Sequence, residues 1–401
     1  MFRKVFLGLA AGVGLLLTVC FAAWFTSTDP QFNPASFEAE PLAPRLATLG
    51  EALTLAQQRL PDGATMTMLV LQYDGAIVSG VDLAGLGAPR SNDPFAVIDA
   101  LDRAALLAAA EDPAATRVQV PIEQLLPAGP SGARHIGTGT NFPEHAEETS
   151  SDSVFNFPKF GTATPARTRV AASPDGLLDY EVELCARFDR PITSVEDFDA
   201  ARKGLFLCAD FTDRVALLEL ADFDNLDSGY GFSDAKSGAG FFPTGPFLVL
   251  PTDWEAFVAS TRMTTAHNGQ ARQDARGREM TLDFRALTDK VLADMEQPRF
   301  FYQGDFFRLA PAQRIDTDMA LMSGTSEGVI FTAPAAHDYI EMLLGYLKAG
   351  GPFSGQGLIE VGVPIFLENE IESGHFLQPG DTVSYRSSTL SEIVVDIVPP
   401  T

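Results

Sequence analysis

The chain has 401 residues, of which 46% are hydrophobic and 20% charged, a composition typical of a globular protein with room for one large or two ordinary domains. Its net charge of -25 argues against nucleic-acid binding, which requires a basic surface, and against docking on anionic lipid head groups through the domain surface. We therefore expect no nucleic-acid partner. The acidity weakly favours solubility and the collection of divalent cations.

The N-terminus predicts a membrane anchor over residues 1–30. Residues 5–25 form an apolar run without a charge, long enough to cross the hydrocarbon core of a bilayer, which is about 30 Å thick. Arg3 and Lys4 precede the run, so we expect this end in the cytoplasm and the rest of the chain on the other side. The alternative is a secreted protein whose signal peptide has been cleaved. The run is long for a signal peptide, and we favour the uncleaved anchor.

Residues 31–130 predict a tether followed by a small α+β region. Residues 26–45 are rich in Ser, Thr, Pro and Asp, which is typical of a linker. The spacing of apolar residues predicts a helix over 45–60, then a strand over 65–73 that ends in a turn at Asp74-Gly75. Residues 93–112 predict an Asp-capped helix that ends before Pro113. No clustered His, Cys or Gly-rich loop occurs here, so we assign this region no chemistry.

Residues 131–401 predict a β-rich domain, and the whole chain an α+β protein. Short apolar runs are separated by Gly, Pro, Asn and Asp, as in strands joined by turns. These runs are GLFLCADF, GPFLVL, MALMSGT, GVIF, LIEVGVPIFL, TVSYRSS and EIVVDIV. Helices are predicted only locally, at FRALTDKVLADM and within an inserted segment over 332–375, from Ala335 to Lys348. Cys185 and Cys208 lie in strand-like segments and are either buried thiols or, in an exported protein, a disulfide.

The stretch LLDYEVELCARF, residues 177–188, predicts a metal site. It alternates like a strand, so Glu181 and Glu183 share a face. A hard cation such as Mg²⁺ binds carboxylate oxygens, and Asp210 at the end of the next apolar run offers a third. Taken alone, a Glu-x-Glu pair is more often a solvated strand face, and an Asp after an apolar run is more often a turn residue.

Other motifs predict catalytic groups. His145 and Glu148 lie three residues apart and would share a face of a short helix, where the carboxylate raises the basicity of the imidazole. Lys236 precedes a Gly-rich loop and is placed to stabilise an oxyanion, and Thr325 lies in a Ser-Gly-Thr turn able to hold a carboxylate. Each feature also occurs without function, as an exposed turn, a solvated lysine or a common Gly turn.

In order and rough spacing, the motifs of residues 131–401 resemble those of the fumarylacetoacetate hydrolase family. They are NFPEHAEE, DYEVELC, CADFTDR, AKSGAGFFPTGP, HNGQARQDARGREM, MSGTSEGV and LQPGDTVSYR. The resemblance implies a mixed β-roll catalytic domain and a homodimer. It also implies that Glu181, Glu183 and Asp210 bind a divalent ion, Mg²⁺ first, with Mn²⁺ or Ca²⁺ as alternatives.

The same resemblance implies roles for the remaining site residues. His145 and Glu148 match the pair that activates water, Lys236 the lysine beside the metal, and Arg214 and Thr325 the groups that bind the substrate. The implied reaction is hydrolysis of a carbon–carbon bond in a small 2-oxo or 1,3-dioxo acid such as an acylpyruvate. Alternatives are a decarboxylase, isomerase or hydratase of the same family, or a non-catalytic module that binds organic acids.

The sequence departs from the family pattern mainly where the substrate is recognised. Leu217 stands where fumarylacetoacetases have a substrate-binding glutamine, and Gly238-Ala239-Gly240 stands where an Asp is common. ADFTDR also replaces the usual Asn-Asp-x-Ser-Ala-Arg. The metal ligands are therefore better predicted than the substrate.

Overall fold

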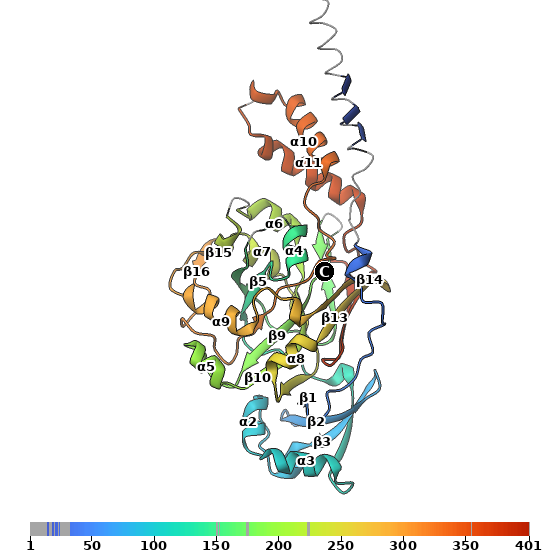
Figure 1. Ribbon diagram of the computed structural model, residues 1–401, viewed down its shortest axis with the longest axis vertical. Coiled ribbons are helices and arrows are strands. Elements are labelled where there is room, and N and C mark those ends of the chain that lie inside the picture. Colours follow the sequence, from blue (N-terminus) through green and yellow to red (C-terminus); the bar gives the residue numbers. More distant parts are fainter. Residues whose placement is uncertain are drawn as a thin grey trace, which may run out of the picture. The chain divides into compact units, whose positions relative to one another are not determined.

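The computed structural model describes residues 14–15, 18–19, 21–22, 24, 33–149, 151, 153–173, 176–222, 225–353 and 355–400. The chain divides into a larger unit, Asn33–Val329 with Leu377–Thr401, and a smaller unit, Met1–Phe32 with Ile330–Phe376. The larger unit contains all the described strands, and the smaller unit contains the paired helices α10 and α11 (Figure 1). The boundary predicted near residue 130 falls inside the larger unit.

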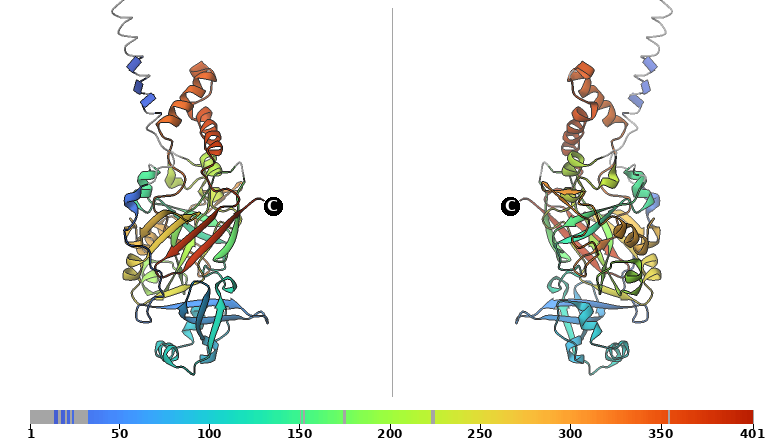
Figure 2. Two further views of the ribbon diagram at one scale, coloured as in Figure 1. Left: turned by 90° about the vertical axis from the view of Figure 1, so that its right-hand side faces the viewer. Right: turned by 90° about the vertical axis from the view of Figure 1, so that its left-hand side faces the viewer.

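A ten-stranded sheet runs through the larger unit and joins the N-terminal region to the rest (Figures 1 and 2). In spatial order its strands are β4 (Arg117–Pro121), β3 (Ile77–Asp82), β2 (Thr65–Tyr73), β1 (Ala52–Arg59), β12 (Leu248–Pro251), β10 (Lys203–Ala209), β9 (Val182–Phe188), β17 (Leu321–Met322), β5 (Arg134–Gly139) and β6 (Phe155–Phe160). Neighbouring strands of this sheet pair antiparallel except β17 and β5, which are parallel, so the sheet is mixed. The predicted β-rich α+β fold is confirmed.

A second sheet has five strands, and β19 and β7 in it are parallel. Its order is β14 (Gln270–Arg276), β13 (Arg262–His267), β18 (Thr382–Ser387), β19 (Glu392–Val398) and β7 (Arg167–Ala171). Two small pairs are β11 (Thr212–Asp213) with β8 (Leu178–Asp179), and β15 (Phe300–Tyr302) with β16 (Asp305–Phe307).

Helices of the larger unit are α2 (Pro94–Asp99), α3 (Arg103–Glu111), α4 (Pro143–Glu148), α5 (Val195–Ala200), α6 (Arg214–Leu220), α7 (Phe232–Lys236), α8 (Trp254–Ser260) and α9 (Phe284–Ala293).

The N-terminal region is more strand-like than its sequence predicts. The helix predicted over 45–60 is wrong, because Ala52–Arg59 forms β1 between β2 and β12, where its first residues are buried on both faces. Pairing on both sides outweighs a helical spacing of leucines. The strand over 65–73 and its turn are confirmed as β2. The helix predicted over 93–112 is divided in two, because the Asp102 side chain caps a new start at α3.

Strands β9 and β10 lie at the centre of the larger unit and carry the residues of interest. From Val182 to Cys208 their paired residues are almost entirely buried, on both faces, which fits their near-continuous apolar sequences. The predicted single strand over 177–188 is interrupted, because β8 ends at Asp179 and β9 begins at Val182. This break leaves Glu181 outside the ladder, directly beside the core.

The smaller unit is built on α10 (Ala336–Lys348) and α11 (Leu358–Ser373), which lie side by side. The helix predicted from Ala335 to Lys348 is confirmed, whereas the strands expected at GVIF and LIEVGVPIFL are wrong. GVIF leaves the larger unit without pairing, and LIEVGVPIFL is helical despite Pro364. A Cβ on Gly362 would lie 2.4 Å from the Met342 Cε and 3.1 Å from the Met342 Cβ, so the two helices approach closely at this glycine.

The membrane-spanning helix predicted over residues 5–25 lies largely outside the described residues. Within the described part of the chain, every helix is too short or too polar to cross a bilayer.

A buried histidine beside the central strands should make the stability of the protein depend on pH. His135 on β5 is fully buried; its Nε2 donates to the Gly161 carbonyl and its Nδ1 accepts from the Ala320 amide. Burial, together with the charge of Lys159, lowers its pKa from 6.5 to about 3. Below the unfolded pKa the unfolded chain therefore binds a proton that the folded chain does not, so stability falls as the pH falls.

We expect this group alone to lower the free energy of unfolding by about 3 kcal/mol between about pH 7 and about pH 4.5. His135→Gln retains one donor and one acceptor but does not titrate, so its urea midpoint should depend less steeply on pH over this interval. Equal slopes for the variant and the wild type would contradict the assignment.

Candidate metal centre

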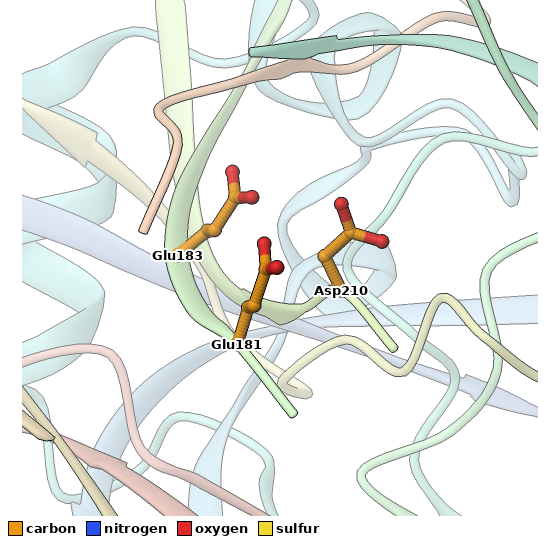
Figure 3. Close-up of side chains that lie close together, drawn as sticks. All are labelled: Glu181, Glu183 and Asp210. Carbon is orange, nitrogen blue, oxygen red and sulfur yellow. The ribbon is translucent and has the colours of Figure 1, made fainter. Parts of the chain in front are cut away.

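Three carboxylates meet at the broken end of β9, as the sequence predicts (Figure 3). Glu181 lies in the break between β8 and β9, Glu183 lies on β9, and Asp210 directly follows β10. Each contributes one oxygen to a group whose members all lie within 4.8 Å of one another. The Asp210 amide donates to the Glu181 carbonyl at 3.0 Å, which fixes the ends of the two strands together.

The carboxylates are buried but incompletely hydrogen-bonded. Glu183 and Asp210 are fully buried, and Glu181 is 4% exposed. Glu183 Oε2 accepts from the Gly324 amide at 2.8 Å, whereas Glu183 Oε1 has no hydrogen-bond partner in the described chain and Asp210 Oδ2 has only an ion pair with Lys236 at 3.1 Å. Buried carboxylate oxygens are costly unless they are paired or bind a metal. The donor set therefore fits a hard divalent cation.

The electrostatics of the cluster point to the same conclusion. Burial, with the negative charges of Asp210 and Glu181, raises the pKa of Glu183 well above its usual range. Burial opposes ionisation of Glu181 as well, but the charges of Lys236 and Arg214 outweigh it and lower the pKa of Glu181. Lys236 and Arg214 thus stabilise the charge of Glu181, whereas the Glu183 carboxylate forms no ion pair with a basic side chain.

Three basic side chains contact the Glu181 and Asp210 carboxylates. Lys236 at the end of α7 donates to Glu181 Oε2 at 2.7 Å and lies 3.1 Å from Asp210 Oδ2. Arg214 binds Asp179 and Glu181 and is 3% exposed. Lys159 on β6 donates to Asp210 Oδ1 at 2.6 Å and to the Lys236 carbonyl.

Lys159 is a site residue that our reading of the sequence missed. It is completely buried, although the apolar strand FNFPKF contains it without any acidic neighbour in sequence. A lysine inside an apolar strand indicates a buried acidic partner, because lysine is rarely buried unpaired. Its partner Asp210 lies 51 residues away in sequence, so the pairing itself could not be predicted.

The predicted His–Glu pair is present on α4. His145 Nδ1 lies 2.8 Å from Glu148 Oε2; His145 is buried and Glu148 is partly buried. The second Glu148 oxygen accepts from the Gly328 amide at 3.3 Å. Because a carboxylate only accepts, Nδ1 carries the proton and Nε2 remains as the basic nitrogen.

Arg214 and Thr325, predicted to bind substrate, both bind the protein itself in this structure. The Arg214 guanidinium is ion-paired as described above, and the Thr325 hydroxyl donates to the Val182 carbonyl at 2.9 Å. Gln273 donates to Thr325 Oγ1 at 2.8 Å and accepts from the Val182 amide. Gln273 thus ties the Thr325 turn to the strand of the metal ligands. The predicted contacts of Arg214 and Thr325 with substrate stay predictions.

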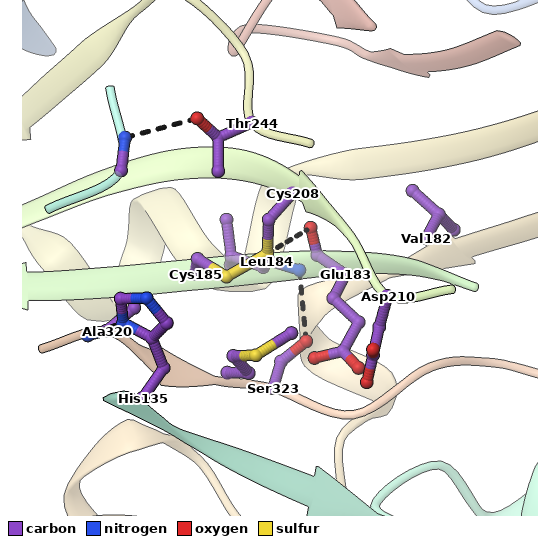
Figure 4. Close-up of a disulfide and its surroundings, with 12 residues drawn as sticks. His135, Val182, Glu183, Leu184, Cys185, Cys208, Asp210, Thr244, Ala320 and Ser323 are labelled. Carbon is purple, nitrogen blue, oxygen red and sulfur yellow. Dashed lines mark hydrogen bonds between the residues drawn. A yellow bond between two sulfur atoms is a disulfide. The ribbon is translucent and has the colours of Figure 1, made fainter. Parts of the chain in front are cut away.

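A disulfide between Cys185 and Cys208 joins β9 to β10 directly behind the carboxylates (Figure 4). Each cysteine lies two residues from a carboxylate, Cys185 from Glu183 and Cys208 from Asp210. The bond resolves the two alternatives that the sequence left open. It also cross-links the two strands whose relative position sets the distance between the ligands.

Removing the disulfide should lower stability. It closes a loop of 23 residues, and the chain-entropy estimate for such a loop is about 3 kcal/mol. We expect Cys185→Ala with Cys208→Ala to lose about this much free energy of unfolding. Urea unfolding under non-reducing conditions measures the loss, and Cys20→Ala, which leaves the bond in place, is the control. An unchanged midpoint for the double variant would contradict the prediction.

Fold and site together define a β-rich α+β protein with a buried acidic cluster suited to a divalent cation. Residues 134–398 match the family model described as fumarylacetoacetate (FAA) hydrolase C-terminal. The chain belongs to the fumarylacetoacetate hydrolase family.

Solved structures share the fold at low sequence identity. The fumarylacetoacetate hydrolase of the psychrophilic Exiguobacterium antarcticum is 16% identical, with a TM-score of 0.52, over 87% of this chain and 100% of that one. A 5-carboxymethyl-2-hydroxymuconate delta-isomerase from Mycobacterium smegmatis is also 16% identical, with a TM-score of 0.50, over 87% of this chain and 100% of that one. A search of curated proteins found no match.

Proposed function

We propose that this protein is a metal-dependent hydrolase that cleaves a carbon–carbon bond in a small 2-oxo or 1,3-dioxo acid. The observation that supports it most strongly is the buried cluster of Glu181, Glu183 and Asp210, in which one oxygen of the Glu183 carboxylate has no hydrogen-bond partner. Family membership supports an enzymatic role. A divalent ion bound by these three residues would supply a Lewis acid that polarises a substrate carbonyl.

The charge balance of the site suits an anionic substrate. Four carboxylates, those of Asp179, Glu181, Glu183 and Asp210, face three cations, those of Lys159, Arg214 and Lys236. With all of them ionised, the cluster carries one net negative charge, and a divalent ion would make it one net positive charge. A carboxylate substrate would then neutralise the site, whereas a cationic substrate would meet repulsion.

The His145–Glu148 pair is the proposed general base. Glu148 holds the imidazole with its Nδ1 protonated, so Nε2 can take a proton from water. Glu148 also stabilises the imidazolium that results, because the carboxylate faces the positive charge. Lys236, already among the carboxylates, is placed to stabilise negative charge that develops on an oxygen of the substrate.

The test is an ultraviolet assay of an acylpyruvate with the full chain in detergent. Loss of the dioxo absorbance that stops on addition of a chelator and returns with Mg²⁺ or Mn²⁺ is the expected result. Products identified by mass spectrometry should be pyruvate and the free acid. Glu255→Gln, which alters an exposed glutamate on α8, is the control that should behave as wild type.

Other outcomes of the same assay would replace the proposal. A product of unchanged mass would indicate an isomerase, and loss of carbon dioxide from an oxo acid a decarboxylase. Gain or loss of water without cleavage would indicate a hydratase. Ligand binding with no product would favour a module that binds organic acids.

We also propose that the domain lies outside the cytoplasm and forms a homodimer. The disulfide supports the first part, because such bonds persist mainly in oxidising compartments. Protection of the domain from protease in intact cells that disappears when the outer permeability barrier is opened would support a periplasmic location. The proposed homodimer rests on the family alone. A scattering mass of one protomer in detergent would contradict it.

A further inference from the structure

Exposed apolar side chains are concentrated in the α10–α11 hairpin, residues 336–373. Seven large apolar residues of this hairpin are exposed: Tyr339, Leu343, Leu344, Leu347, Phe353, Leu358 and Ile359. Within the described residues of the larger unit, only Phe306 is similarly exposed. Large exposed apolar patches on soluble proteins mark interaction sites. The hairpin is therefore the part of the described chain that needs a covering partner.

Most of these side chains lie at the connecting end of the hairpin, residues 343–359, which we call the tip. The tip carries one charge, Lys348, and is bounded by Glu341 and Glu360. Phe353 is 96% exposed and Ile359 71% exposed. They are not needed to pack the two helices, because Met342, Phe366 and Leu367 are the buried apolar residues of the pair.

The chemistry of the tip fits a lipid bilayer. Leucine, isoleucine and phenylalanine beside a single lysine form a surface whose apolar groups can enter the acyl boundary while the lysine reaches the head groups. The acidic residues of the helices, such as Glu368 and Glu372, lie outside the tip. Burial of apolar area is therefore the basis of this contact, and attraction to anionic lipid is not.

The N-terminal run favours a bilayer over a second protein. Residues 5–25 contain no charge, and the described residues of this run belong to the same compact unit as the hairpin. The Trp24 ring lies 6.2 Å from that of His337 at the start of α10, so the end of the run is close to the hairpin. A second copy would need a larger surface, because a typical interface uses about 20–30 residues on each side.

We propose that the tip, residues 343–359, inserts into the interfacial layer of the membrane that holds the N-terminal run. The proposal depends on the predicted anchor for the choice of bilayer and is independent of the proposed catalytic function. The hairpin would give the protein a second contact with the membrane besides the anchor.

Tryptophan quenching tests the proposal on the full chain. The protein is reconstituted into phosphatidylcholine vesicles, with or without bromine on the acyl chains. Phe353→Trp adds a fluorophore at the most exposed apolar position of the tip, and Phe306→Trp adds one at the exposed apolar position of the larger unit. Emission of the unmodified chain, with Trp24 and Trp254, is subtracted from both.

We expect brominated lipid to remove about half of the emission added at position 353, because interfacial side chains reach about 5–10 Å into the head-group and acyl boundary. The emission added at position 306 should be unchanged. Ile359→Trp should repeat the result at a second position of the tip. The proposal is overturned if neither tip position is quenched more than position 306. Emission at 353 that shifts with protein concentration in detergent, without quenching in vesicles, would identify a second copy as the partner and would also overturn it.

Discussion

Glu183→Gln is expected to abolish metal binding while leaving the metal-free protein at least as stable as the wild type. Glu183 is fully buried, and one of its carboxylate oxygens has no hydrogen-bond partner. Glutamine has nearly the same shape but lacks the charge that a hard cation requires. We expect the affinity for Mn²⁺ to fall by more than about 100-fold and turnover by about 1,000-fold.

In the presence of a chelator, Glu183→Gln should be at least as stable as the wild type, although it binds metal more weakly. Burial and the neighbouring carboxylates raise the pKa of Glu183 well above its usual value. A raised folded pKa means that the contribution of this group to stability is present at acidic pH and is lost as the pH rises above the unfolded value. As the pH rises from mildly acidic to neutral, the melting temperature of the metal-free wild type should therefore fall relative to that of Glu183→Gln, which shares the other titrating groups and lacks this one.

Two measurements check this prediction. Calorimetric titration with Mn²⁺ reports the affinity, and thermal unfolding with chelator or excess metal reports the two stabilities. Metal should raise the melting temperature of the wild type, because it binds only the folded state, and should not raise that of the variant. A variant that keeps metal-dependent stabilisation, or that melts lower than the wild type in chelator, would contradict the assignment of Glu183 as a ligand.

The clustering of the three carboxylates could be predicted from the sequence because part of its signal is local. Glu181 and Glu183 are two residues apart, so their carboxylates stay close even though Glu181 lies in the break between β8 and β9 and not on the predicted continuous strand. The His145–Glu148 contact follows in the same way from a spacing of three residues on a short helix. Assigning Asp210 required the motif order, because its approach depends on the pairing of β9 with β10.

Contacts that depend on distant partners were not predictable from the sequence. The hydroxyl of Thr325 and the guanidinium of Arg214 bind Val182 and Asp179, so neither is simply available to a substrate. Residues 45–60 read as a helix because Leu46, Leu49 and Leu53 have helical spacing, yet sheet partners on both sides of residues 52–59 decide the structure. LIEVGVPIFL reads as a strand, but helix α10 provides a surface for it to pack on as a helix.

Lys159→Met is expected to produce the opposite pair of effects, lower stability without metal and tighter binding of metal. Lys159 donates to Asp210 Oδ1 at 2.6 Å, and both side chains are completely buried. Methionine fills a similar volume but leaves the Asp210 carboxylate with less compensation. Breaking a buried ion pair by removing one partner costs about 3–5 kcal/mol, and we expect a loss of this size.

Removal of the lysine charge should also favour a cation in the cluster. The Lys159 ammonium lies against a ligand of the proposed metal, so it repels a divalent ion. Without it, Asp210 keeps only the ion pair with Lys236, which Glu181 shares, so a bound metal ion should restore part of the lost stability. Urea unfolding in chelator and in excess Mn²⁺ measures both effects on one sample.

A second buried lysine provides the matched control. Lys203 on β10 is 8% exposed and donates to the Asp199 carbonyl, away from the carboxylate cluster. Lys203→Met removes a positive charge from the same sheet, so it should leave the response to metal unchanged. If Lys159→Met weakened metal binding, the main effect of Lys159 would be to hold the Asp210 carboxylate in position for the metal, and its repulsion of the metal would be the smaller effect. If both variants lost equal stability with equal responses to metal, the ion pair with Asp210 would have no particular role in the centre.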